Sequence, residues 1–153
     1  MSDSSFAARR RLLTAIAVMP LAVTASPSFA AVPKVFVTKL EGCGCCDEWA
    51  AHLRKNGFSV SVRALPDLAP VRRKNRTRDF DTCHTATVEG YVIEGHVPAA
   101  DIHRLLRAQL KVAGLVVPGM PAGSPGMESS GKEPYDVLTF DRSGTTQVFA
   151  SYR

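Results

Sequence analysis

Three of the four cysteines in this sequence, Cys43, Cys45 and Cys46, lie within four positions, and the fourth, Cys83, lies in a separate segment. A disulfide between cysteines so close in sequence closes a very short loop, so it removes little entropy from the unfolded chain. Sulfur at this density therefore indicates redox chemistry or metal binding rather than covalent stabilisation of a fold.

Several thiolates within a few ångströms repel one another, so they must be oxidised, protonated or neutralised by a metal. Cys43 and Cys46 have the C-x-x-C spacing of thiol–disulfide oxidoreductases, in which Cys43 would be the nucleophile and Cys46 the resolving thiol. That alternative chemistry leaves Cys45 without a partner. Because a third clustered cysteine is surplus to a dithiol, we favour metal binding, and in the metal interpretation no catalytic residue is assigned.

The type of metal follows from the ligands. Zn²⁺ would take four sulfurs in one closed tetrahedron, and three cysteines so close in sequence do not easily share one. Cu(I) accepts two or three thiolates and tolerates bridging sulfur. The sequence therefore predicts copper, as Cu(I) and with more than one ion, ahead of zinc. The predicted ligands are Cys43, Cys45, Cys46 and Cys83.

Four further side chains are candidate ligands: His84, His96, Met120 and Met127. His84 is a ligand, a proton acceptor beside Cys83, or a histidine at a strand end bonded to the backbone. His96 either closes over the cluster or caps and packs the helix that follows it. The two methionines offer thioether sulfur to Cu(I), or they fill gaps against the core.

The segments around the cysteines predict how these side chains are positioned. Residues 34–40 form a β-branched run typical of a strand, and residues 58–65 alternate as a second strand. Between them, Cys46, Trp49 and Leu53 recur at helical spacing, and Gly57 ends that helix. The later segments predict a short helix, two strands and a further helix, within 66–80, 85–95 and 98–110, respectively. The order is βαβαββα, an α/β core of the thioredoxin-like type.

The predicted order of strands and helices indicates where Cys83 lies relative to the other cysteines. A cysteine at a helix N-terminus meets unpaired N–H groups and the positive end of the helix dipole, and both lower the pKa of its thiol. In a thioredoxin-like fold the loop that enters the third core strand faces the C-x-x-C segment. We therefore expect Cys83 to face the other three cysteines.

The sequence divides into an N-terminal segment and one domain. Residues 1–30 have a basic start, a short apolar run and small residues before position 31, which is typical of a signal peptide. Residues 31–153 are expected to form a single thioredoxin-like metal-binding domain with a core at about 34–110. A Gly/Pro/Met loop at 114–134 and a β-hairpin at 135–152 follow as an extension.

The signal peptide predicts export to the periplasm, by the Sec route or, given Arg9-Arg10, by the twin-arginine route. After its cleavage we expect no membrane association. Without residues 1–30 the formal net charge falls from +5 to +3, because that segment holds three arginines and one aspartate. This mild charge gives no reason to expect nucleic-acid binding.

Four stretches of the chain resemble a family of exported bacterial proteins that includes CopG, a copper-resistance protein. They are "CGCCDEWAAHLRKNGF", "CHTATVEGYVIEGHVPAADIHRLL", "GLVVPGMPAGSPGM" and "YDVLTFD". The resemblance implies a thioredoxin-like fold and a periplasmic multinuclear copper site bridged by Cys43, Cys45, Cys46 and Cys83. It also implies a role in copper resistance and copper redox cycling. The segment "RKNRTRDFDTCHT" departs from this family, whose members usually approach the Cys-His pair through a Gly-Val-Pro turn and a serine.

The predicted function is therefore an exported copper-binding protein, with a periplasmic thiol–disulfide oxidoreductase as the alternative. A site that changes the oxidation state of copper would make the protein a copper-dependent oxidoreductase, whereas one that only holds copper would not. The expected partners are copper ions and a periplasmic copper-handling or redox protein.

Overall fold

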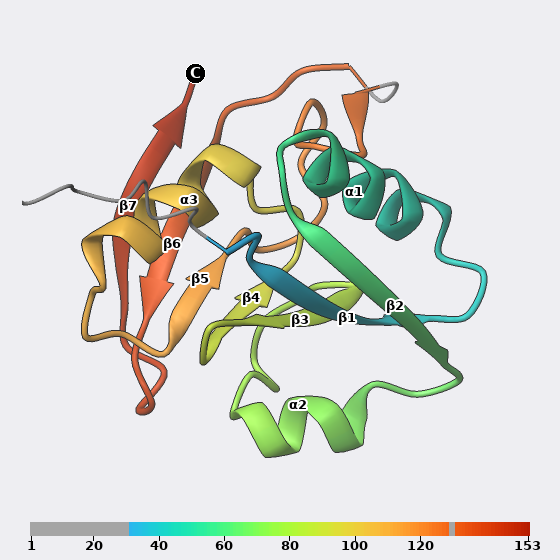
Figure 1. The fold of residues 1–153 in the computed structure, drawn as a ribbon, viewed down its shortest axis with the longest axis horizontal. Helices are drawn as coiled ribbons and strands as arrows, with labels where there is room; N and C mark the ends of the chain where they lie inside the picture. The colour runs from blue at the N-terminus through green and yellow to red at the C-terminus, as the bar shows by residue number, and fades with distance from the viewer. Residues whose placement is uncertain (1–30, 129–130) are drawn as a thin grey trace, which may run out of the picture. The chain divides into compact units, whose positions relative to one another are not determined.

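The computed structural model describes residues 31–128 and 131–153, so the predicted signal peptide lies outside the described residues. Residues 31–153 are built on a mixed sheet of seven strands in the order β2-β1-β3-β4-β5-β6-β7 (Figure 1). The strands are β1 (Lys34–Leu40), β2 (Ser59–Leu65), β3 (His84–Val88), β4 (Tyr91–Glu94), β5 (Gly114–Val116), β6 (Tyr135–Phe140) and β7 (Thr146–Tyr152). The helices are α1 (Gly44–Lys55), α2 (Ala69–Asn75) and α3 (Ala99–Ala108).

The pairing of the strands brings the start of α1 close to the start of β3. β1 pairs in parallel with β2 and antiparallel with β3, so the chain leaves β1 at the same end at which it enters β3. The backbone N–H of Leu40 donates to the carbonyl of Cys83 at 3.4 Å, which extends this pairing by one residue. The first turn of α1 therefore begins beside the residues that precede β3.

The core lies between the sheet and the helices α1 and α3, and α2 lies on the opposite side of the sheet (Figure 1). On α1 the buried residues are Cys46, Trp49, Ala50 and Leu53, the positions predicted from helical spacing. Alternate residues of β1 face this core, and α3 covers its other end with Ile102 and Leu105. The burial of these apolar side chains supplies most of the free energy that holds α1 against the sheet.

The α/β class predicted from the sequence is confirmed, and the elements up to α3 follow in the predicted order. The prediction was wrong at the start of the long loop, because residues 114–116 form β5. β5 pairs in parallel with β4 and antiparallel with β6. The terminal hairpin therefore continues the core sheet rather than standing apart as an extension. Three residues are too few to show a strand pattern in sequence.

Gly114 is the residue that allows β5 to join the sheet. A Cβ atom at this position would lie 1.7 Å from the carbonyl oxygen of Val92 and 2.7 Å from its carbonyl carbon. Both atoms belong to the backbone of the neighbouring strand, so neither can move without separating β4 from β5.

We expect Gly114→Ala to lower the free energy of unfolding by about 2 kcal/mol or more, as overpacking against backbone does. Urea unfolding followed by circular dichroism measures the loss. Gly44→Ala is the control, since a Cβ at Gly44 meets no atom within 4 Å. A loss at Gly114 no larger than that of the control would contradict the close approach of β5 and β4.

Candidate metal and redox site

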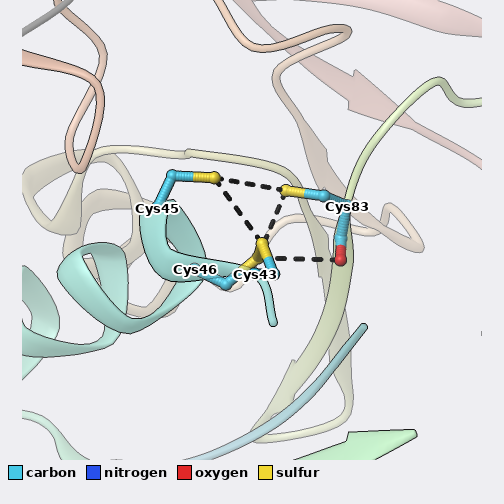
Figure 2. Close-up of side chains that lie close together, drawn as sticks. All are labelled: Cys43, Cys45, Cys46 and Cys83. Carbon is cyan, nitrogen blue, oxygen red and sulfur yellow. Dashed lines mark hydrogen bonds between the residues drawn. A yellow bond between two sulfur atoms is a disulfide. The ribbon is translucent and has the colours of Figure 1, made fainter. Parts of the chain in front are cut away.

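The four cysteine side chains converge on one point, with three from the start of α1 and one from the segment before β3 (Figure 2). Their sulfur atoms all lie within 4.8 Å of one another. The sulfur of Cys83 lies 3.2 Å from that of Cys46 and 3.9 Å from that of Cys45. The structure thus brings Cys83 to the place where the order of elements predicted it.

Two of the four cysteines are joined, because Cys43 and Cys46 form a disulfide. Cys45 and Cys83 are free thiols, and the sulfur of Cys45 lies 3.6 Å from that of Cys43. A disulfide sulfur is a poor metal ligand, since metals bind the deprotonated thiol. The full set of four sulfur ligands therefore exists only after two electrons have reduced the Cys43–Cys46 bond.

The thiol of Cys83 lies in an environment that disfavours its charged form. Burial raises the pKa of Cys83 to about 12, and the neighbouring sulfur of Cys45 adds to this effect. The guanidinium of Arg72 opposes the shift but is outweighed. Near neutral pH Cys83 is therefore a neutral thiol until a metal displaces its proton.

Two buried histidines extend the site beyond the sulfurs. His84 Nδ1 lies 3.8 Å from the sulfur of Cys83, and His96 Nε2 lies 3.6 Å from the same atom. The two rings stack with their centroids 5.3 Å apart. Together with Cys46 and Cys83 they form a second group of donor atoms that lie within 4.8 Å of one another.

Both histidines are held neutral. Burial, with a smaller contribution from the nearby His96, lowers the pKa of His84 to about 3. Burial likewise lowers the pKa of His96 to about 4, against the opposing charge of Glu128. A neutral imidazole is the form that binds metal. The second ring nitrogens, His84 Nε2 and His96 Nδ1, have no hydrogen-bond partner among the described residues.

Lys39 supports the loop that carries the first cysteine. Its ammonium group donates to the carbonyl of Cys43 at 3.1 Å and to the carboxylate of Asp47 at 2.8 Å. Lys39 is almost completely buried, and it joins the end of β1 to the first turn of α1.

The Gly/Pro/Met loop passes close to the cluster at Gly126. A Cβ atom at Gly126 would lie 2.6 Å from the carbonyl oxygen of Cys45 and 2.9 Å from the backbone nitrogen of Trp49. Met127 follows directly and is half-buried, whereas the side chain of Met120 is 52% exposed. Binding of copper by the thioether sulfurs of these two methionines stays a prediction.

These features define a mixed α/β protein with a partly buried cluster of cysteine and histidine side chains that could hold a metal ion and that also contains a disulfide. A family model described as a protein of unknown function, DUF411, matches residues 80–127. That range contains Cys83, both buried histidines and both methionines.

Two solved structures named copper resistance protein CopG are similar to this chain, and both are 40% identical to it in sequence. Form 1 matches with a TM-score of 0.73, over 78% of this chain and 96% of its own. Form 2 matches with a TM-score of 0.74, over 79% of this chain and 98% of its own. No curated protein sequence matches the chain. The chain belongs to the CopG-type family, as its cysteine motifs predicted.

Sequence reasoning missed two buried charged side chains close to the site: Lys39, and Glu94, which accepts hydrogen bonds from the hydroxyls of Thr82 and Thr85. Lys39 follows Val35 and Val37 at alternate positions of β1, so its inward orientation could have been predicted from the period of two. Glu94 gives no such signal, because it stands between an apolar residue and a glycine at the end of a short strand.

We expect alkylation of Cys83 in the disulfide form to rise about tenfold per pH unit from pH 8 to pH 10 without a plateau, because the thiolate is the reactive species. Rates measured by mass spectrometry with iodoacetamide test this. The unfolded protein is the control, and its Cys83 should level off near the ordinary thiol pKa. A plateau for the folded protein below pH 9 would show that burial does not hold the proton.

Proposed function

We propose that this protein is a periplasmic copper-binding protein of copper resistance that holds more than one Cu(I) ion in a cysteine-bridged site. The observation that carries the proposal is the pair of overlapping donor groups, which share Cys46 and Cys83. Together they offer four sulfurs and two neutral imidazoles, more donors than one tetrahedral ion takes. Sulfur atoms common to both groups are suited to bridge two ions.

Zinc is the competing metal. In a tetrahedral site with Zn–S bonds of about 2.3 Å, two sulfurs lie about 3.8 Å apart. The distances of 3.6 and 3.9 Å from Cys45 to Cys43 and Cys83 would suit such a site. Copper is favoured because the donors outnumber those of one zinc ion and because both solved relatives are named for copper resistance.

The disulfide favours a second candidate function, a thiol–disulfide oxidoreductase of the thioredoxin class. Cys43 precedes the first residue of α1, as the sequence predicted for an attacking cysteine, and it already forms the Cys43–Cys46 bond. The order β1-α1-β2-α2-β3-β4-α3 supports a thioredoxin-like core for either function. Under this candidate Cys45 and Cys83 would be dispensable.

Within the described residues no helix is both long and apolar enough to cross a membrane. The proposed location in the periplasm rests on the predicted signal peptide and on the family. A partner that supplies electrons is part of the proposal, because the Cys43–Cys46 bond must be reduced before all four sulfurs can bind metal. If that partner then cycles copper between oxidation states, the protein is a copper-dependent oxidoreductase.

Cu(I) titration of the purified protein without oxygen, against a chelator of known affinity, tests the copper proposal. We expect the reduced protein to bind several equivalents tightly and to protect all four thiols from alkylation. The disulfide form should bind fewer equivalents, since only Cys45 and Cys83 are then free. Equal stoichiometry in the two forms, or one equivalent of zinc held in preference to copper, would contradict the proposal.

Serine variants separate the two candidate functions. We expect Cys45→Ser and Cys83→Ser to lower the copper stoichiometry, because each removes a sulfur from the cluster. Under the oxidoreductase candidate the same variants would keep full activity in reducing a disulfide-bonded test peptide. Cys43→Ser is the common control, as it should abolish dithiol activity and also weaken copper binding. An unchanged copper stoichiometry in Cys83→Ser would show that Cys83 is not a ligand.

A further inference from the structure

A carboxylate is buried beside the cysteine cluster, at the end of β4. Glu94 is fully buried, with none of its surface exposed. Its two oxygens accept hydrogen bonds from two threonine hydroxyls, Oε2 from Thr82 at 2.7 Å and Oε1 from Thr85 at 2.8 Å. Removing a carboxyl group from water is costly, so these bonds need to be kept in the folded state.

The two threonines flank the part of the chain that reaches the cluster. Thr82 directly precedes Cys83, and Thr85 directly follows His84. β3 begins at His84, and one further backbone hydrogen bond, from the N–H of Leu40 to the carbonyl of Cys83, continues the pairing only as far as Cys83. The backbone pairing of the sheet therefore does not hold Thr82. Glu94 thus holds both ends of a four-residue stretch whose middle residues carry the Cys83 sulfur and the His84 ring.

Thr82 also accepts hydrogen bonds from a residue of α2. The Arg72 guanidinium donates to the backbone carbonyl of Thr82 and, at 3.1 Å, to its hydroxyl oxygen. Arg72, Thr82 and Glu94 therefore form a continuous chain of hydrogen bonds from α2 to β4.

We propose that Glu94 is a positioning residue for Cys83, which it holds within bonding reach of Cys46 through Thr82 and Thr85. The proposal deepens the proposed function and rests on it for the role of Cys83 as a ligand, but the position of Cys83 can be measured without metal. Buried charged groups add little to stability in general, so a role in fixing local geometry explains better why a carboxylate stands here.

The test uses a protein with Cys43→Ser and Cys45→Ser, in which only Cys46 and Cys83 can form a disulfide. Equilibration with glutathione, without metal, gives the effective concentration of one thiol at the other. We expect the pair to close readily in this background, as the two sulfurs lie 3.2 Å apart. Adding Glu94→Gln should lower the effective concentration about tenfold or more, because a shift of about 1 Å has effects of that size on reacting groups.

Matched variants separate positioning from stability. Thr82→Val and Thr85→Val should repeat the loss, and Thr82→Ser, which keeps the hydroxyl, should restore the parent value. Thr87 is the next residue on the same face of β3 and pairs with Val92 rather than Glu94. In Thr87→Val the effective concentration of the thiol pair should therefore stay within about twofold of the parent value. Ile93→Val serves as a destabilising control, since Ile93 belongs to the core on the opposite face.

Three results would overturn the proposal. The first is a Cys46–Cys83 pair that does not close in the parent background. The second is an unchanged effective concentration in both Glu94→Gln and Thr85→Val. The third is a fall in effective concentration in Ile93→Val as large as that in Glu94→Gln when the two variants have a similar drop in Tm. That result would make the role of Glu94 purely structural. A protein that binds no copper would remove the proposed function, yet these metal-free values would still report whether Glu94 positions Cys83.

Discussion

The geometry of the sulfur cluster depends on the packing of Trp49. This side chain is fully buried on α1, the helix that carries three of the four cysteines. Its indole N–H donates to the carbonyl of Val97 at 2.9 Å, and its ring lies 4.3 Å from the ring of His84. One aromatic residue thus joins the helix to the segments that carry both histidines and Cys83. A buried aromatic side chain with a satisfied polar group is well suited to fix such a junction.

The electrostatics of the site follow from this packing. Burial keeps the Cys83 thiol and both imidazoles neutral, so the metal-free site places no set of like charges together. The guanidinium of Arg72 lowers the pKa of Cys83 but is outweighed by burial. A metal that enters must supply the free energy to displace the proton of Cys83, which soft ions gain from binding thiolate. At the proposed metal site, this proton would therefore favour strongly thiophilic ions over harder ones.

Much of this arrangement could be predicted from sequence because it rests on local patterns. Helical spacing placed Trp49 and Leu53 on the inner face of α1, and the order of elements placed Cys83 opposite the other cysteines. The rest depends on contacts between distant segments, which carry no local pattern. β5 is too short to recognise, and its place in the sheet depends on the backbone of Val92 lying against Gly114. Glu94 likewise contacts Thr82 and Thr85, and no local sequence pattern indicates that these threonines lie beside a carboxylate.

The disulfide and the metal site compete for the same atoms. The Cys43–Cys46 bond uses two of the four sulfurs, and one of these, Cys46, belongs to both donor groups. Oxidation therefore removes two donors from the four-cysteine group and one from the group that includes the histidines, whereas loss of Cys45 would affect only the first group. Under the proposed function, the protein would lose metal capacity when the Cys43–Cys46 bond forms and regain it when two electrons reduce that bond. In the proposed periplasmic setting, the supply of electrons would then limit how many sulfur donors are available to copper, while occupancy would still depend on the copper concentration.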